Sequence, residues 1–194
     1  MSNPRMKRLL PMLCLLLLCG TAFAASPPLP GDSVYQLDAK LTNQDGKVDT
    51  LAGRRGRVQL VSMFYTSCTM VCPMIIDTLK ATRKAIDEPA REQLDVLAVS
   101  FDPARDDVAA LHRYAGVHKL DLAHWTLARS GPTDVRQLAA LLGLQYRQLP
   151  DGDFNHSSEL ILLDADGRIA ARTTVIGRLD PAFVEAVRKT LASH

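Results

Sequence analysis

The sequence predicts an α/β sandwich in which a central mixed β-sheet is flanked by helices. The apolar runs 58–65 and 94–101 are typical of strands buried on both faces, and each is followed by apolar residues at helical spacing. Two further segments, 159–163 and 168–173, flank the turn sequence Asp164-Ala165-Asp166-Gly167, which is typical of an antiparallel hairpin. Strands linked through helices, followed by a hairpin and a last helix, indicate a mixed sheet.

The N-terminus, residues 1–24, has the form of a secretory signal peptide. Basic residues precede the apolar run 9–19, and Ala22-Phe23-Ala24 fits a small-x-small cleavage site. The apolar run is shorter than the roughly 20 residues that a membrane-spanning helix needs. We therefore expect cleavage after Ala24, with retention of the leader as a membrane anchor as the alternative.

Charge and cysteine content narrow the possible functions of the remaining chain. The leader carries three of the 23 basic residues and none of the 21 acidic ones, so no basic excess remains and no nucleic-acid partner is expected. Cys14 and Cys19 lie in the leader, which leaves Cys68 and Cys72 in a compartment where disulfides persist. A loop closed between cysteines four residues apart is too short to stabilise a domain, so we favour a chemical role for this pair. A local disulfide without function is the alternative.

The first half of the domain, which we expect to cover residues 34–194 after a proline-rich lead-in at 25–33, contains the central strands. The segments 34–41 and 47–51 flank an Asp-Gly turn signal at 43–46 and predict an N-terminal β-hairpin. The buried strand 58–65 leads into a helix over 73–87, because Pro73 suits the first helical position and Pro89 stops the helix. The second buried strand covers 94–101.

The second half alternates helices and strands and ends in the hairpin. A helix is predicted over 105–118, a short strand over 125–128, and a helix over 134–142 with Thr133 as its N-cap and Gly143 at its end. The segment 145–149 precedes a polar loop, 150–157, that contains His156. The hairpin and a helix over 181–192 complete the chain, which shows no internal repeat and no second domain.

Cys68 and Cys72 are the strongest candidates for chemistry. They stand at the join between a buried strand and a helix N-terminus, where the partial positive charge lowers the pKa of a thiol. Their spacing allows a disulfide and also lets two thiolates face one ion. Two thiolates and an imidazole form a soft set that suits Cu(I), and the imidazole lets the site accept Cu(II) as well. Zinc would need a fourth ligand, and no other histidine stands at a spacing that nominates it.

The remaining candidates each have a plainer alternative role. His156 is the candidate third ligand, although a lone histidine in a polar loop is often only solvated. Met70 and Met74 bring thioethers that could assist a soft metal, but packing is the favoured interpretation. Asp102 follows the second buried strand, where it either caps the next segment or orients the ligand histidine.

Three stretches together resemble the Sco/SenC family, and the similarity covers essentially the whole chain after the leader. The stretches are Tyr65-Thr66-Ser67-Cys68-Thr69-Met70-Val71-Cys72-Pro73, then Ser100-Phe101-Asp102-Pro103-Ala104-Arg105-Asp106, and Asn155-His156-Ser157 ahead of an apolar strand. Each motif alone is modest, but all three in this order are specific. The chain departs from the family at Thr69 and Met70, where the family often has Pro-Asp.

The resemblance implies a thioredoxin-like fold, a periplasmic location and one bound copper ion, as Cu(I), Cu(II) or both. By position, Cys68 and Cys72 match the paired thiols, His156 the third ligand, and Asp102 an acidic residue near the site. The implied function is that of a copper metallochaperone that helps assemble the dinuclear copper centre of cytochrome c oxidase. The implied partners are the copper-site subunit of that oxidase, or another copper protein, and a copper donor protein; a membrane is involved only if the leader is retained.

Two enzymatic functions compete with this binding role. A periplasmic thiol–disulfide reductase would use Cys68 and Cys72 on partner cysteines, and one thiol pair could serve both roles. A peroxidase is disfavoured because peroxiredoxin-like sites place Thr three residues before the reactive Cys, where this chain has Tyr65.

Overall fold

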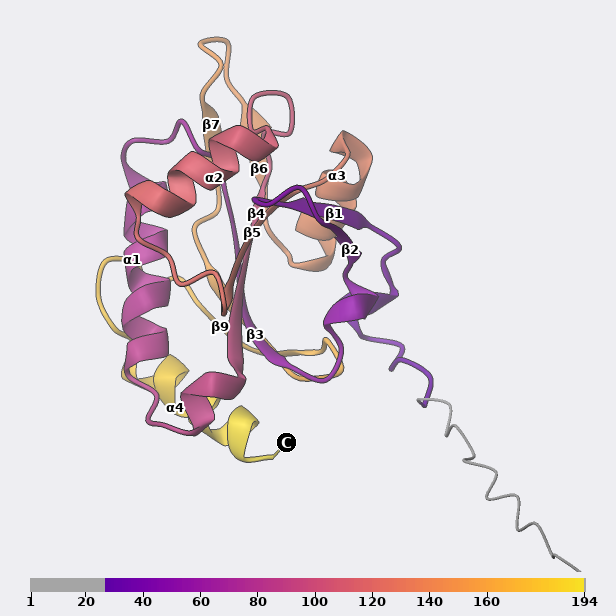
Figure 1. The fold of residues 1–194 in the computed structure, drawn as a ribbon, viewed down its shortest axis with the longest axis vertical. Helices are drawn as coiled ribbons and strands as arrows, with labels where there is room; N and C mark the ends of the chain where they lie inside the picture. Colours follow the sequence, from indigo (N-terminus) through magenta and orange to yellow (C-terminus); the bar gives the residue numbers. More distant parts are fainter. Residues whose placement is uncertain (1–26, 194) are drawn as a thin grey trace, which may run out of the picture.

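The computed structural model describes residues 27–193 and confirms the order of strands and helices around the two buried strands (Figure 1). The predicted signal peptide, residues 1–24, lies outside the described residues. The elements are η1 (Val34–Gln36), β1 (Lys40–Asn43), β2 (Val48–Thr50), η2 (Ala52–Arg54), β3 (Val58–Phe64), α1 (Val71–Lys84), η3 (Ala90–Gln93), β4 (Leu94–Ser100), α2 (Val108–Val117), β5 (Trp125–Arg129), α3 (Pro132–Leu141), β6 (Tyr146–Gln148), β7 (Phe154–His156), β8 (Leu160–Leu163), β9 (Ile169–Thr173) and α4 (Pro181–Ala192).

A seven-stranded mixed sheet in the order β2-β1-β5-β4-β3-β8-β9 forms the centre of the molecule. β3 runs parallel to β4, and β4 runs parallel to β5, while β1, β2, β8 and β9 add antiparallel pairs. The register pairs Val58 with Leu94 and Phe64 with Ser100, so β3 and β4 end side by side. The segments that follow these two strands therefore emerge at the same edge of the sheet, which is where the candidate residues gather.

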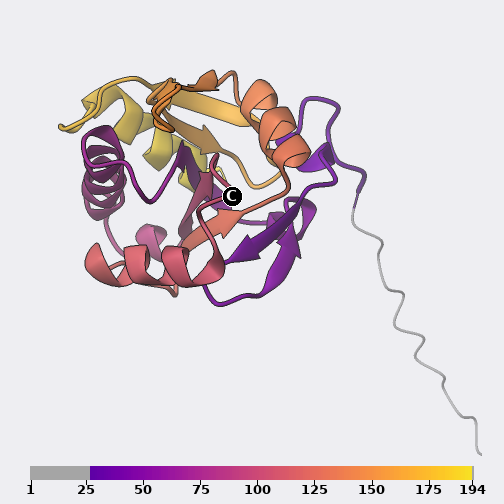
Figure 2. The same cartoon turned by 90° about the horizontal axis from the view of Figure 1, so that it is seen from above.

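Helices cover both faces of the sheet. Figures 1 and 2 show α1 and α2 on one face and α3 on the other. α4 lies on the same face as α1, as shown by a hydrogen bond of 2.8 Å that Arg188 of α4 donates to the Ala85 carbonyl just after α1. Every residue of β3 is buried, as expected for a strand covered on both faces. Within residues 27–193 no helix is long and apolar enough to cross a bilayer.

The N-terminal β-hairpin is present, but its first strand is shorter than predicted. Val34–Gln36 forms a 3-10 turn instead of extended chain, because the Ser33 hydroxyl accepts the Tyr35 N–H at 3.1 Å and caps the turn. The strand begins only at Lys40, and β1 then pairs antiparallel with β2 as the turn signal predicts.

Three helix starts also differ from the prediction. α1 begins at Val71, so Pro73 is its third residue; the position is tolerated because the first four N–H groups of a helix have no intrahelical partner. α2 begins at Val108, after the Asp107 side chain accepts the Ala110 N–H. Pro132 is the first residue of α3, so Thr133 lies inside the helix and is not its N-cap. For α2 and α3 a local cap or a proline sets the start more sharply than apolar spacing could.

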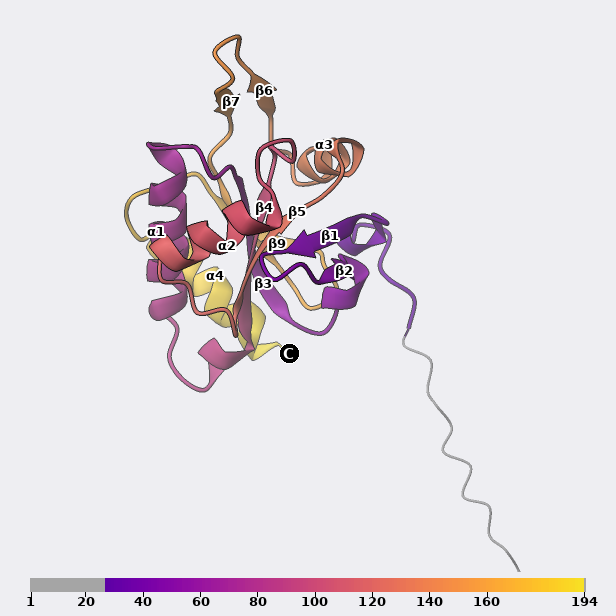
Figure 3. The same cartoon turned by 45° about the horizontal axis from the view of Figure 1, so that its top comes forward.

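The predicted polar loop 150–157 is wrong in part, because its C-terminal end is a strand. β6 and β7 pair antiparallel in a separate two-stranded sheet, with Tyr146 opposite His156. Figure 3 shows this hairpin extending away from the rest of the fold. His156 therefore ends a strand and is held by backbone pairing.

Candidate metal centre

The structure brings Cys68, Cys72 and His156 together. Cys68 lies in the loop after β3, Cys72 is the second residue of α1, and His156 ends β7. Each offers one ligand atom, and these atoms all lie within 4.8 Å of one another. Both thiols are free, and both are buried. One ion placed among the three atoms would meet two sulfurs and one nitrogen, a soft donor set that fits copper.

No fourth ligand joins this group within the described part of the chain. The group contains only the two cysteines and the histidine among His, Cys, Asp and Glu side chains. His112 instead faces Asp45 at 3.8 Å, His124 lies between Asp95 and Glu92, and His118 packs on a tyrosine ring. A closed structural zinc site would need four ligands, so the three-ligand set fits copper better.

The pKa values of the two thiols are shifted in opposite directions. Burial opposes ionisation of Cys68, but hydrogen bonds from the Cys72 N–H, the Cys72 thiol and the Met70 N–H outweigh it, and the pKa of Cys68 lies below its usual value. The Cys72 N–H, at the start of α1, lies 3.4 Å from the Cys68 sulfur. Because this N–H belongs to the positive end of a helix, it stabilises the thiolate.

Cys72 behaves in the opposite way because it is more deeply enclosed. Burial raises the pKa of the Cys72 thiol well above its usual value, and the charges of Cys68 and Asp106 raise it further. Cys72 is fully buried, whereas Cys68 retains 8 % of its exposure. The pair therefore combines one readily ionised, slightly accessible thiol with one protonated, inaccessible thiol.

His156 is oriented by a backbone carbonyl. Its Nδ1 atom lies 2.9 Å from the Ser157 carbonyl oxygen, which can only accept a hydrogen bond. Nδ1 therefore carries the hydrogen in this contact, and the lone pair of Nε2 is left for a metal ion. The ring also lies against Phe101, at 4.8 Å between centroids, and meets Tyr65 edge-on at 6.0 Å.

Aromatic packing fixes the β6–β7 hairpin over the strand ends. Phe101, which follows β4, stacks on Tyr146 of β6 at 5.3 Å and meets Phe154 of β7 edge-on at 5.0 Å. Tyr65 packs against Phe154 at 5.1 Å and donates a hydrogen bond to Asp153. The cluster joins the cysteine-bearing loop to the histidine-bearing hairpin.

Asp102 reaches the hairpin through an arginine and does not contact His156 directly. Its buried carboxylate pairs with Arg105. The Arg105 guanidinium also donates to the Gly152 carbonyl and lies 5.7 Å from the centroid of the Phe154 ring. The role of Asp102 in orienting the histidine stays a prediction, and Arg105 is the residue through which it would act.

Asp106 is the buried carboxylate beside the site that sequence reasoning did not single out. Its carboxylate accepts the Thr66 N–H at 3.0 Å, the Thr66 hydroxyl at 2.5 Å and the Ser100 hydroxyl at 2.5 Å. It thereby ties the loop before Cys68 to the end of β4. The residue is completely buried. Its only sequence signal is its place in the same motif as Asp102, and spacing does not say which of the two carboxylates turns toward the cysteine loop.

Met70 and Met74 are not core residues. Met70 is 80 % exposed and Met74 is 46 % exposed. Packing in the core is therefore excluded for both residues, and packing at the surface is left. The methyl group of Met74 lies close to Gly177 there.

Comparison with known proteins identifies the family. A sequence model described as SCO1/SenC matches residues 31–192. The chain belongs to the SCO1/SenC family. Among its relatives, the SCO1 protein homolog of Bacillus subtilis is 26 % identical over 132 residues, which cover 66 % of this chain and 67 % of the relative. The mitochondrial SCO2 homolog of Mus musculus is 30 % identical over 170 residues, 83 % of this chain and 64 % of the relative.

Solved structures of Sco proteins share the fold. ScoI of Arabidopsis thaliana with copper bound has a TM-score of 0.69 at 20 % identity, covering 80 % of this chain and 96 % of that structure. ScoI of Bradyrhizobium japonicum with copper bound has a TM-score of 0.65 at 24 % identity, covering 78 % of this chain and 94 % of that structure. The predicted thioredoxin-like α/β fold is thus confirmed, and the SCO1/SenC family includes proteins that bind copper.

Proposed function

We propose that this protein is a copper metallochaperone that carries one copper ion on Cys68, Cys72 and His156. The observation that carries this proposal is the convergence of the two sulfurs and one imidazole nitrogen within 4.8 Å. Membership of a family with copper-binding members supports it.

The three ligands would act differently on the ion. Cys68 is ready to bind as a thiolate, because the N–H groups of α1 already favour its ionised form. Cys72 must lose its proton on binding, and the positive ion compensates for the buried negative charge that results. His156 adds a neutral nitrogen whose orientation the Ser157 carbonyl sets. Binding should therefore release protons and weaken as the pH falls.

We further propose that the copper acceptor is the copper-site subunit of cytochrome c oxidase. BsSco, a structural relative, is a member of the Sco family of cytochrome c oxidase assembly proteins, which supports this assignment. Another copper protein is the alternative acceptor, and a copper donor protein would supply the ion. The signal-peptide form of residues 1–24 supports export to the periplasm, either released or anchored by the leader.

Copper stoichiometry on the fully reduced protein tests the binding site. We expect wild type to retain one equivalent after desalting and His156→Ala to lose it. His112→Ala is the matched control, because His112 is exposed on α2 and lies outside the cluster. Tight retention of one equivalent by His156→Ala would rule out the three-ligand site. Retention of no copper by wild type would rule out the chaperone function.

Thiol–disulfide reduction is the second candidate, favoured by the asymmetry of the two thiols. The Cys68 thiolate would attack one sulfur of a partner disulfide, forming a mixed disulfide and releasing the partner's other sulfur as a thiolate. Cys72, after losing its proton to solvent, would then attack the Cys68 sulfur. The Cys68–Cys72 bond forms, the mixed disulfide breaks, and the partner leaves with both sulfurs reduced. An external thiol reductant must restore the pair.

Trapping separates this activity from copper binding. Cys72→Ser should accumulate a mixed disulfide with a disulfide-containing substrate, because the second attack is blocked. His156→Ala should reduce the same substrate at the wild-type rate. Absence of a trapped species from both Cys72→Ser and Cys68→Ser would exclude the reductase.

A further inference from the structure

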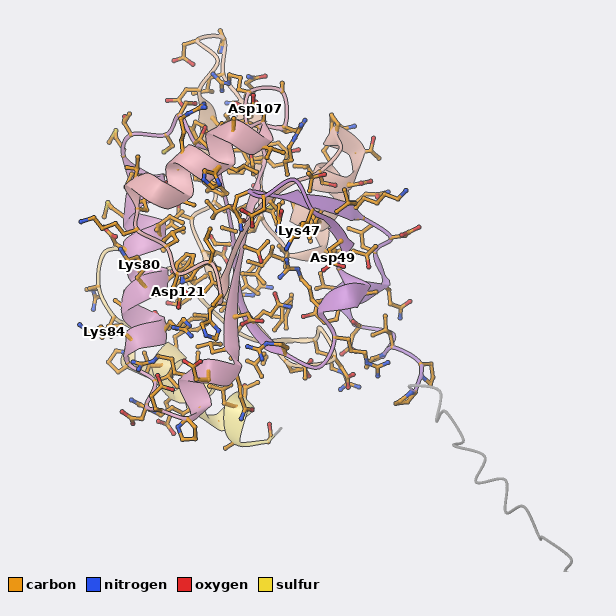
Figure 4. The ribbon with its side chains drawn as sticks, in the orientation of Figure 1. Lys47, Asp49, Lys80, Lys84, Asp107 and Asp121 are labelled. Carbon is orange, nitrogen blue, oxygen red and sulfur yellow. The ribbon has the colours of Figure 1, made fainter. Side chains whose placement is uncertain are left out.

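A polar cleft of about 490 Å³ lies on the sheet face opposite α1 and α2. Phe64 of β3 packs on Tyr114 of α2, and Gln59, five residues earlier, points to the other face because strand side chains alternate. Gln59 lines the cleft, together with residues of the β1–β2 hairpin, η2 and the start of β4. Figure 4 labels Lys47 and Asp49, which come from the hairpin side of this cleft.

The cleft carries more positive than negative side chains. Four basic residues line it, against Asp49 and Asp95: Lys47, Arg54, Arg55 and Arg57. Arg55 is neutralised by Asp166 at 2.8 Å, and Arg57 pairs with Asp95 at 2.6 Å. Among residues 27–193, no carboxylate oxygen lies within 4.0 Å of a charged nitrogen of Lys47 or Arg54. Two cations of the cleft therefore form no ion pair within the described chain.

The guanidinium group of Arg54 is only partly satisfied by hydrogen bonds within the described chain. Its Nε atom is buried and has no hydrogen-bond partner in the described chain. One terminal nitrogen reaches the Gln59 oxygen only at 3.4 Å, while the Gln59 amide group donates to the Tyr35 hydroxyl at 2.9 Å. Burial lowers the pKa of the Arg54 guanidinium, and the attraction of Asp49 only partly offsets this effect. A partly buried cation whose Nε–H group has no acceptor is unfavourable, so an anion in the cleft would stabilise it.

We propose that this cleft is a binding site for a small oxyanion, a carboxylate or a phosphate group. The planar guanidinium of Arg54 presents parallel N–H donors that match two oxygens of such a group, and Lys47 adds a second positive charge. The site is separate from the thiols. Gln59 stands near the start of β3 and Cys68 follows its end, and the strand between Gln59 and Phe64 alone spans about 16 Å.

Calorimetric titration of the reduced protein tests this proposal, with inorganic phosphate and succinate as separate ligands. We expect saturable binding of at least one of them, and the tighter one identifies the anion class. Arg54→Gln should weaken binding about tenfold or more, as expected for the loss of charge-assisted hydrogen bonds. Arg113→Gln, at an exposed position on α2, is the matched control and should bind as wild type. Copper stoichiometry should be the same in all three proteins.

A second variant keeps the test decisive if Arg54→Gln does not fold. Lys47→Gln removes an exposed charge in the turn before β2 and should weaken binding while leaving the fold intact. The proposal is overturned if neither anion binds wild type. It is equally overturned if Arg54→Gln, or Lys47→Gln in its place, binds both anions as tightly as Arg113→Gln.

Discussion

Asp106→Ala should destabilise the protein and loosen its metal centre together. The substitution removes the carboxylate that accepts three hydrogen bonds from Thr66 and Ser100. Ser100 is fully buried, so its hydroxyl hydrogen would be left without an acceptor, at a cost of about 1–3 kcal/mol. The half-buried Thr66 groups regain water in part and add a smaller loss.

The total loss in the free energy of unfolding should be about 3–4 kcal/mol, because bonds to one carboxylate are not additive. For a domain of this size, that corresponds to a fall in Tm of about 10 °C. Thr66 is two residues before Cys68, so release of the loop should also weaken copper binding by about tenfold, the equivalent of about 1.4 kcal/mol.

The assay is denaturant unfolding of the reduced, metal-free protein. Trp125, the single tryptophan in the sequence, lies buried on β5 and reports unfolding by its fluorescence. Asp107→Ala is the matched control, since the adjacent Asp107 is exposed and only caps α2 (Figure 4). It should cost about 1 kcal/mol and leave copper binding unchanged. Equal unfolding midpoints for the Asp106→Ala and Asp107→Ala proteins would refute the conclusion that the Asp106 carboxylate holds the loop before Cys68 to the end of β4.

Three further predictions follow from the contacts around the site. Arg105→Ala removes the link from Asp102 to the β6–β7 hairpin, and should weaken copper binding about tenfold in a competition titration while costing only about 1 kcal/mol in unfolding. Iodoacetamide should alkylate Cys68 with a pH midpoint below that of an ordinary thiol, because its folded pKa is lowered, while the raised pKa and burial of Cys72 leave it unmodified, as mass mapping would show. Met70→Leu should change the free energy of unfolding by less than about 0.5 kcal/mol, because this side chain is exposed.

Each of these predictions has a clear contrary result. Wild-type copper affinity in Arg105→Ala would show that the hairpin is positioned without that arginine. Alkylation of Cys72 before Cys68 in the native protein would reverse the order of their proton affinities. A loss of more than about 1 kcal/mol in Met70→Leu would mean that this thioether packs against the protein surface more than its exposure indicates.

The strands and the thiol pair could be predicted from sequence because their signals are local. β3 and β4 are continuous apolar runs, and the cysteines stand where such a run meets a proline at a helix start. The position of His156 could not be derived this way. β6 and β7 are three residues each and largely polar, so no alternation marks them. The loop position alone made His156 a weak candidate ligand, and the family resemblance strengthened it.

The contacts of Asp106 could not be predicted from the sequence, for a physical reason as well. Asp102 and Asp106 belong to one motif, and both are buried. Which carboxylate meets the cysteine loop depends on the turn between β4 and α2 and on contacts with Thr66, 40 residues away in the chain. Such long-range contacts leave no periodic trace in the sequence.

Because His156 lies on the separate β6–β7 hairpin, the three candidate ligands are not held to the domain equally firmly. Cys68 and Cys72 stand on one continuous segment at the start of α1, whereas His156 is mounted on a two-stranded unit held mainly by ring contacts. Two-stranded hairpins are marginal by themselves, so we expect this arm to open at a lower free energy than that of unfolding the domain. The imidazole then acts as a tethered ligand whose effective concentration at the thiols is set by how long the hairpin stays docked. A partner that wedges apart the rings of Phe101 and Phe154 would lower that effective concentration, and could take an ion from the two sulfurs in single ligand-exchange steps.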